Sequence, residues 1–221
     1  MLFESILFDL DDTLHDRNKS LCKFIDLFKL QYFDAIDDDS NINLKDVFLK
    51  IDRKGYRPRE EMFNELQNII SWKFKPDLQE LINFWNIEFP KCAEPMDNLY
   101  STLNIFLNKN IKMGIVTNGD SDFQNTKIDK LDLRKYMKVI IISQEVNIRK
   151  PDPKIFQLAL SRINSRNGNT LYVGDNPSTD IKGAFDAGLT TVWLSCGETW
   201  NIEQYKPRYI INNIYELINL F

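Results

Sequence analysis

The 221-residue chain is poor in the residues that build several common kinds of site. It has one histidine and three cysteines, and Cys22, Cys92 and Cys196 lie far apart without CxxC spacing. Neither a disulfide framework nor a zinc site is therefore indicated. Basic residues are not in excess, since 28 Lys and Arg stand against 32 Asp and Glu, a formal charge of −4. No global field attracts a nucleic acid polymer or an anionic membrane, so any bound anion needs a local site.

Long hydrophobic runs are also lacking. No apolar segment approaches the roughly 18–20 residues that span a bilayer. The first residues, MLFES, show neither a basic region nor a small-residue cleavage site of the secretory kind. These features predict a cytoplasmic protein without a membrane partner, and they indicate no particular oligomeric state.

Short apolar runs followed by polar or glycine residues form the main pattern of the chain. They alternate with helix-length segments, which predicts parallel strands in βαβ units. The expected strands are 3–8, 111–116, 139–142, 171–173, 190–194 and an edge strand at 208–211. The expected helices between and after them are 97–110, 152–162, 178–187 and 213–220. The fold class is therefore α/β, a Rossmann-like three-layer sandwich with a parallel sheet.

One connection is far longer than the others. About a hundred residues separate the first two strands, whereas such connections usually need about 2–6 residues. Helical spacing of apolar residues recurs in this stretch, and prolines separate the helical patterns. We expect a small all-helical cap domain at 16–94, inserted into an α/β core formed by 1–15 and 95–221.

Acidic residues follow the first strand directly. Asp9, Asp11 and Asp12 lie within four positions of one another, and ligands of open α/β sheets bind at the carboxyl ends of strands. Three like charges this close shift their pKa values or are neutralised by a cation. A hard ion such as Mg²⁺ suits carboxylate oxygens, especially if Asp175, after another strand, converges on the same place.

Three further strand ends carry complementary groups. Thr117 and Asn118 offer a hydroxyl and backbone N–H donors for a phosphoryl oxygen. Lys150 supplies a cation at the start of a helix, where the helix dipole also favours an anion. A tight turn at Gly174–Asp180 adds two carboxylates, Asp175 and Asp180.

These segments occur in an order that resembles the haloacid dehalogenase (HAD) superfamily, in its phosphatase branch. The four matching segments are DLDDT at 9–13, TN at 117–118, RKPDPKIF with Lys150 at its second position, and GDNPSTD at 174–180. One such motif would be weak, but four in order on expected strand ends are specific. The helical insert occupies the place of the family's cap. The insert position and the segment GDNPSTDIKGAFDAGLTTVWL resemble a subgroup containing 5′-nucleotidases, phosphoglycolate phosphatases and sugar or sialic-acid phosphatases.

The resemblance implies a role for each matching residue. Asp9 would be the nucleophile that forms an aspartyl-phosphate, and Asp11 would protonate the leaving alcohol and then activate water. Thr117, the amide of Asn118 and Lys150 would stabilise charge on the transferring phosphoryl group. The result would be hydrolysis of a small phosphorylated metabolite.

The resemblance also implies a magnesium site. Asp9, the backbone carbonyl of Asp11 and Asp175 would hold Mg²⁺, with Asp180 nearby as an outer ligand or orienting group. Asp11 favours phosphate esters, because the dehalogenases of the superfamily need neither a metal nor an acid at that position. Two alternatives stay open: a phosphomutase with the same site residues, and a catalytically idle binding protein that keeps the fold.

Two features outside the motifs are expected to be structural. His15 is interpreted as a hinge or flap residue, since Asp11 already fills the acid–base role. A basic cluster in the insert is interpreted mainly as a solvated helix face. A second interpretation is that one or two of its members bind a further anionic group of the substrate. The cluster comprises Lys50, Arg53, Lys54, Arg57 and Arg59.

Overall fold

The computed structural model describes residues 3–37 and 42–221, so Met1 and Leu2 of the N-terminal segment lie outside it. The chain divides into two compact units. The core unit comprises Met1–Asp16 and Pro95–Phe221, and the helical unit comprises Arg17–Glu94. None of the helices in the described ranges has the length and apolar character that crossing a membrane would require.

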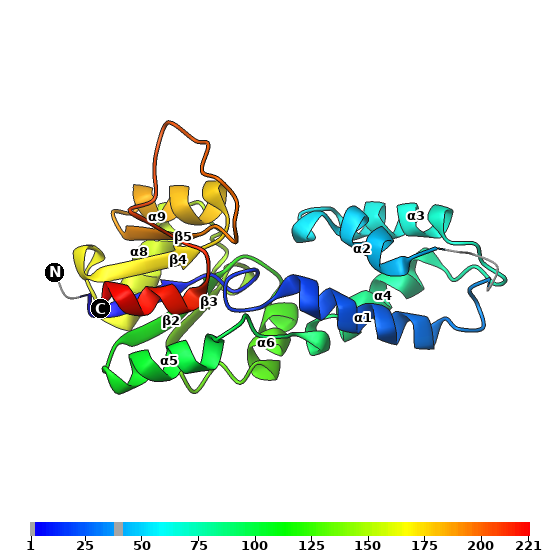
Figure 1. The fold of residues 1–221 in the computed structure, drawn as a ribbon, viewed down its shortest axis with the longest axis horizontal. Helices are drawn as coiled ribbons and strands as arrows, with labels where there is room; N and C mark the ends of the chain where they lie inside the picture. Colours follow the sequence, from blue (N-terminus) through cyan, green and yellow to red (C-terminus); the bar gives the residue numbers. More distant parts are fainter. Residues whose placement is uncertain (1–2, 38–41) are drawn as a thin grey trace. The chain divides into compact units, whose positions relative to one another are not determined.

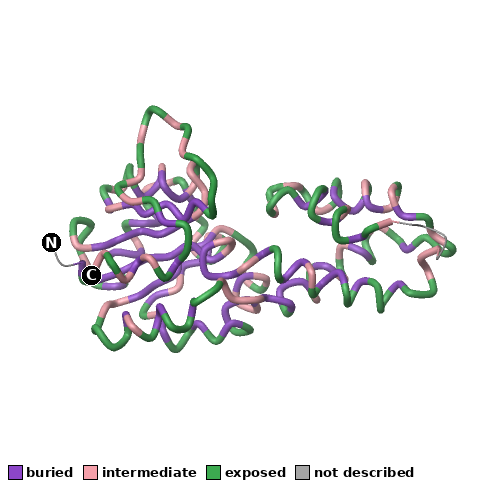
Figure 2. The backbone as a smooth tube through the Cα atoms, viewed as in Figure 1, coloured by how far each residue is buried: buried purple, intermediate pink, exposed green. Residues whose placement is uncertain are grey.

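The core unit is built on a six-stranded parallel sheet with the order β3-β2-β1-β4-β5-β6 (Figure 1). Its strands are buried along most of their length (Figure 2), which explains why the sequence shows continuous apolar runs instead of alternation. The Rossmann-like α/β fold class is confirmed. The strands are β1 Ser5–Phe8, β2 Lys112–Thr117, β3 Met137–Ile142, β4 Thr170–Gly174, β5 Thr190–Leu194 and β6 Tyr209–Ile211.

Helices lie on both faces of this sheet (Figure 1). α8 (Pro153–Ile163) and α9 (Lys182–Asp186) pack their apolar side chains on one face, in a cluster that includes Leu7, Phe156 and Tyr172. α5 (Leu99–Asn108) lies on the other face with the C-terminal 3₁₀ helix η5 (Ile214–Leu220). The sheet is therefore covered on both sides, as a parallel sheet requires.

Two helices in the described part of the core unit are not predicted from the sequence. They are α6 (Ser121–Lys130) and the short α7 (Ser143–Val146). The sequence of α6, SDFQNTKIDK, is mostly polar, so hydrophobic periodicity does not reveal it. Its start is marked by Asp120, whose side chain accepts a hydrogen bond from the Phe123 backbone N–H at 3.2 Å.

The helical unit contains α1 Arg17–Gln31, α2 Leu44–Asp52, α3 Arg59–Ile69 and α4 Leu78–Glu88. Its interior is rich in aromatic rings. Phe24 packs edge-on against Trp85, with ring centroids 4.7 Å apart, and Trp85 stacks on Phe89 at 4.1 Å. The aromatic residues of the insert are therefore largely the core of this unit.

A buried ion-pair group lies beside these rings. Asp52 accepts two hydrogen bonds from Arg17, at 2.6 and 2.8 Å, and one from Arg59 at 3.0 Å. The Arg59 guanidinium also lies 4.7 Å from the centre of the Trp85 ring. Arg59 therefore takes part in the interior of this unit, whereas Lys50, Arg53 and Lys54 of the basic cluster are exposed.

The Asp52 carboxylate gives the helical unit a defined dependence on pH. Burial raises its pKa, but hydrogen bonds and charge from Arg17, with the charge of Arg59, outweigh burial and lower the pKa below the ordinary 3.8. The stabilisation is complete above the unfolded-state value and is lost as pH falls through the lower folded-state pKa. Because Asp52→Asn leaves buried guanidinium charge unpaired, we expect it to lower the free energy of unfolding by about 3 kcal/mol at pH 7.

Urea unfolding between pH 7 and pH 3 measures this effect. The difference between wild type and Asp52→Asn should be constant at neutral pH and shrink below about pH 3.8. Glu60→Gln, an exposed change in α3, is the matched control and should leave stability unchanged. A difference that stays constant down to pH 3 would contradict the assignment.

Candidate active site

The topology brings the predicted strand ends to one edge of the sheet. β1 lies between β2 and β4, so Asp9, Thr117 and Asp175 follow or end three adjacent parallel strands. The Asp9 backbone N–H continues the pairing, donating to the Val173 carbonyl at 2.9 Å. Parallel strands end at the same edge, which is why residues more than a hundred positions apart in the sequence meet here.

Three carboxylates gather at this edge. Ligand oxygens of Asp9, Asp175 and Asp180 all lie within 4.8 Å of one another. Asp180 comes this close because position 174 is glycine: a Cβ added there would lie 2.5 Å from the Asp180 Cγ. The Asp180 carboxylate also accepts a hydrogen bond from the Asn176 backbone N–H at 3.0 Å. Asp180 therefore lies inside the carboxylate cluster.

Lys150 neutralises part of this charge. Its Nζ donates to Asp9 Oδ1 at 2.5 Å, to Asp180 Oδ1 at 2.6 Å and to the Tyr172 hydroxyl oxygen at 3.1 Å. The Tyr172 hydroxyl lies 3.0 Å from Asp180 Oδ1, to which it can donate. These contacts use all three N–H groups of the ammonium.

The single positive charge of Lys150 does not balance the three carboxylates. Burial, followed by the charge of Asp180, raises the pKa of Asp9 to about 7. Burial and the charges of Asp180 and Asp9 also raise the pKa of Asp175 well above its ordinary value. Burial lowers the pKa of Lys150, but the two carboxylates it contacts raise it further, so Lys150 stays charged. The excess negative charge and the all-oxygen donor set fit a divalent cation such as Mg²⁺.

The Asp11 side chain belongs to a second group. Asp11 Oδ1 lies 2.7 Å from His15 Nδ1 and accepts a hydrogen bond from Lys127 Nζ at 2.6 Å. Its Oδ2 accepts one from Gln124 Nε2 at 3.0 Å. Asp9 and Asp11 therefore have different neighbours, although they are two positions apart.

The side chains of Thr117 and Asn118 have different hydrogen-bond partners. Thr117 Oγ1 is buried and accepts a hydrogen bond from Gln124 Nε2 at 2.6 Å. The Asn118 side chain instead holds the Lys150 backbone, donating to its carbonyl at 3.0 Å and accepting from its N–H at 2.8 Å. The Asn118 side chain thus positions Lys150, and only its backbone N–H stays a candidate for binding a phosphoryl oxygen.

Three residues that contact Asp11 or Asp180 belong to none of the four motifs: Tyr172, Gln124 and Lys127. Tyr172 lies in an apolar strand run and has no distinguishing pattern in the sequence. Gln124 and Lys127 lie on α6, a helix that the sequence does not predict. Their one sequence signal is a pair of polar residues three positions apart after the capping Asp120. His15, interpreted from the sequence as a hinge or flap residue, is fully buried, and its Nδ1 lies 2.7 Å from Asp11 Oδ1.

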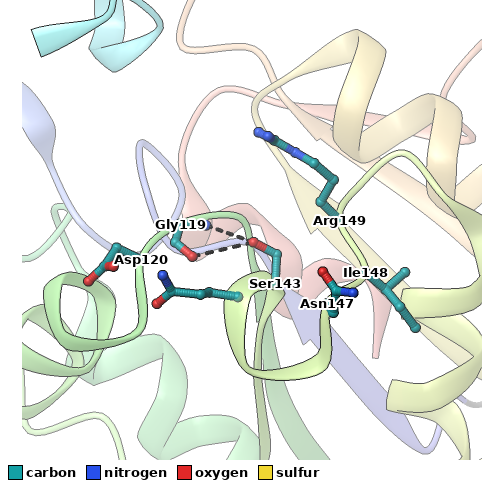
Figure 3. A pocket seen from close by; sticks show the side chains of 7 residues that line it. Gly119, Asp120, Ser143, Asn147, Ile148 and Arg149 are labelled. Atoms are coloured by element: carbon teal, nitrogen blue, oxygen red, sulfur yellow. Dashed lines mark hydrogen bonds between the residues drawn. The ribbon is translucent and has the colours of Figure 1, made fainter.

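A pocket of about 360 Å³ lies beside the loops that carry Asn118 and Lys150 (Figure 3). Gly119 and Ser143 form one wall, where the Gly119 N–H donates to Ser143 Oγ at 3.0 Å, and Arg149 also lines the pocket. This hydrogen bond ties the loop after β2 to the start of α7. None of the three clustered carboxylates lines this pocket.

Comparison with known proteins identifies the family of this chain. Residues 6–194 match the family described as haloacid dehalogenase-like hydrolase. The chain belongs to this family. The resemblance read from the four motifs is confirmed, and the protein is a hydrolase of this family with phosphatases among its relatives.

Two curated relatives and one solved structure illustrate the similarity. Pyrimidine 5′-nucleotidase YjjG of Escherichia coli is 36% identical over 131 residues, which cover 59% of this chain and 58% of YjjG. Glyceraldehyde 3-phosphate phosphatase of Methanocaldococcus jannaschii is 26% identical, covering 99% of this chain and 97% of the relative. The putative HAD-hydrolase YfnB of Bacillus subtilis, solved bound to magnesium, shares the fold, with a TM-score of 0.79, 24% identity, and coverage of 100% of this chain and 99% of YfnB.

Proposed function

We propose that this protein is a Mg²⁺-dependent phosphomonoesterase that hydrolyses a small phosphorylated metabolite through an aspartyl-phosphate on Asp9. The observation that carries the proposal is the separation of two carboxyl environments at one sheet edge. Asp9 lies with Asp175, Asp180 and Lys150, whereas Asp11 is held by a different set of side chains. Two carboxyl groups in distinct environments suit a nucleophile and an acid–base group.

Both steps of the proposed reaction use Asp9 and Asp11. A carboxylate oxygen of Asp9 attacks phosphorus, and the bond from phosphorus to the ester oxygen breaks as Asp11 gives that oxygen its proton. Asp11, now a carboxylate, takes a proton from water, whose oxygen attacks the phosphoryl group. The bond between phosphorus and Asp9 then breaks, which releases inorganic phosphate and restores both carboxyl groups.

Charge stabilisation comes from the surrounding groups. The Lys150 ammonium, the Thr117 hydroxyl and the Asn118 backbone N–H would bind the equatorial phosphoryl oxygens, where charge is spread during the transfer. Asp9, Asp175 and Asp180 would hold Mg²⁺ with the carbonyl of Asp11. The bound ion would offset the repulsion between these carboxylates and the phosphoryl group.

The substrate class is supported by the relatives. One is named for pyrimidine nucleotides and another for glyceraldehyde 3-phosphate, and both of these are small phosphate monoesters. We propose that the helical unit acts as the family's cap and selects the leaving group. Substrate choice would then depend on its side chains, since function is set by the site and not by the fold.

The test is phosphate release from purified protein with Mg²⁺ across a panel of monoesters. The panel contains nucleoside monophosphates, sugar phosphates, phosphoglycolate and glyceraldehyde 3-phosphate. We expect hydrolysis of at least one, with kcat/KM in the range of about 10⁴–10⁸ M⁻¹ s⁻¹ typical of enzymes. Isomerisation of a sugar phosphate without phosphate release, dependent on a bisphosphate activator, would favour a mutase instead. Failure to transform any ester would overturn the proposal.

A further inference from the structure

Lys127 is a buried lysine outside the four motifs. It lies on α6 with 1% of its surface exposed, and burying an ammonium group is unfavourable unless its charge is compensated. Its Nζ donates to Asp11 Oδ1 at 2.6 Å and to Gln124 Oε1 at 2.8 Å. Both contacts belong to the group of side chains around Asp11, which is the proposed acid and base.

Gln124 connects this lysine to the phosphoryl-binding side of the site. Because its Oε1 accepts from Lys127, its amide nitrogen faces the other way. Gln124 Nε2 then donates to Thr117 Oγ1 at 2.6 Å and lies 3.0 Å from Asp11 Oδ2. One amide therefore joins the hydroxyl proposed to bind a phosphoryl oxygen with the carboxylate proposed to protonate the ester oxygen.

We propose that Lys127 and Gln124 are positioning residues that hold the Asp11 carboxyl group at a fixed place relative to Thr117. The inference rests on the proposed function. Lys127 contacts one Asp11 oxygen and Gln124 the other, so rotation of the carboxyl group breaks a hydrogen bond in either direction. His15 supports the same oxygen as Lys127, at 2.7 Å.

The chemical reason is that the two held groups serve atoms of one phosphate ester. Thr117 would bind a non-bridging oxygen, and Asp11 would reach the bridging oxygen of the same phosphorus. Their separation must therefore match the ester closely, and a displacement of about 1 Å can lower a rate about 10²-fold. If Lys127 only stabilised the fold, its loss would slow the hydrolysis of all esters to the same extent.

Esters with different leaving groups distinguish a positioning role of Lys127 from a purely structural one. An alkyl alcohol leaves poorly and needs a proton from Asp11, whereas p-nitrophenolate leaves without one. We therefore compare kcat/KM for p-nitrophenyl phosphate with that for an alkyl phosphate, because kcat/KM reports the first phosphoryl transfer. In Lys127→Met and Gln124→Met the alkyl ester should lose about 10- to 100-fold more than the aryl ester, a part of what general acid catalysis contributes. Lys127→Arg should recover part of the loss.

Two further measurements exclude a general disturbance of the fold. Affinity for Mg²⁺ by calorimetry should be unchanged in the variants, since Lys127 and Gln124 hold the Asp11 side chain, whereas the proposed ligands are the carboxylates of Asp9, Asp175 and Asp180 and the backbone carbonyl of Asp11. Lys130→Met, an exposed change on the same helix, should leave both esters and the melting temperature unaffected. Should Lys127→Met prove unstable, Gln124→Met carries the test, because it removes an uncharged side chain of similar shape.

A double mutant tests whether Lys127 acts through Asp11. In an Asp11→Asn background, Lys127→Met should add little further loss, because it acts through a group that is already gone. Equal losses for the two esters, no loss at all, or full additivity with Asp11→Asn would overturn the inference while leaving the proposed phosphatase intact. If the wild-type protein hydrolyses neither ester nor any member of the panel, the proposed function fails first, and the inference fails with it.

Discussion

Asp9→Asn should lower kcat for phosphate release by about 10⁴- to 10⁶-fold, the loss seen when a nucleophile is removed from a hydrolase. The carboxamide oxygen carries no negative charge and is a poor nucleophile, so no covalent intermediate forms. The substitution also removes a charged partner of Lys150, which donates to Asp9 Oδ1 at 2.5 Å. Phosphate release under saturating substrate measures the effect, together with mass spectrometry of the acid-quenched protein for the phosphorylated aspartate.

The fold should survive this change. The pKa of Asp9 is raised to about 7, mainly by burial and then by Asp180, so its contribution to stability is greatest at low pH and is lost as pH rises through 7. A neutral Asn should therefore not lower the melting temperature of the metal-free protein at pH 8. Asp122→Asn makes the same chemical change at an exposed position of α6 and should keep full activity. An Asp9→Asn protein that retains more than about a hundredth of the wild-type rate would contradict the assignment.

Removal of divalent metal should reduce the activity to background, and Mg²⁺ should restore it. Asp9, Asp175 and Asp180 offer oxygens within 4.8 Å of one another, and burial, followed by the charge of Asp180, raises the pKa of Asp9 and of Asp175. Without a cation, an incoming phosphate dianion meets this negative charge and is repelled. Hydrolysis assays after treatment with EDTA and stepwise addition of Mg²⁺ measure the effect.

Two controls test the metal site: replacement of Mg²⁺ by Ca²⁺, and the gain in unfolding free energy when Mg²⁺ binds. Ca²⁺ binds similar oxygens at longer distances and with more ligands, so it should occupy the site without restoring the rate. Saturation with Mg²⁺ should raise the stability of the core unit, by about 2.7 kcal/mol at a concentration 100 times Kd. Asp175→Asn should abolish this gain, whereas Asp186→Asn, in α9 and outside the carboxylate cluster, should keep it. Undiminished hydrolysis after chelation would contradict a metal-dependent mechanism.

The strand ends could be predicted from the sequence because each is marked locally. Short apolar runs indicate strands buried on both faces, and Asp9, Thr117 and Asp175 stand where such runs end. Once the strands are parallel, their carboxyl ends must share one edge of the sheet. The α/β fold class and the family therefore follow from residues read in order along the chain.

The partners of these residues depend on contacts between distant segments. Asn118 turns its side chain to the backbone of Lys150, and α6 turns two polar residues toward Asp11. Neither arrangement has a signal in hydrophobic periodicity, because polar groups that bond inside the protein look like surface groups in the sequence. The strands and the charged residues at their ends can therefore be predicted from local sequence patterns. The pairing of those charges cannot, because hydrogen bonds between side chains far apart in the chain exist only after the sheet and its helices have packed.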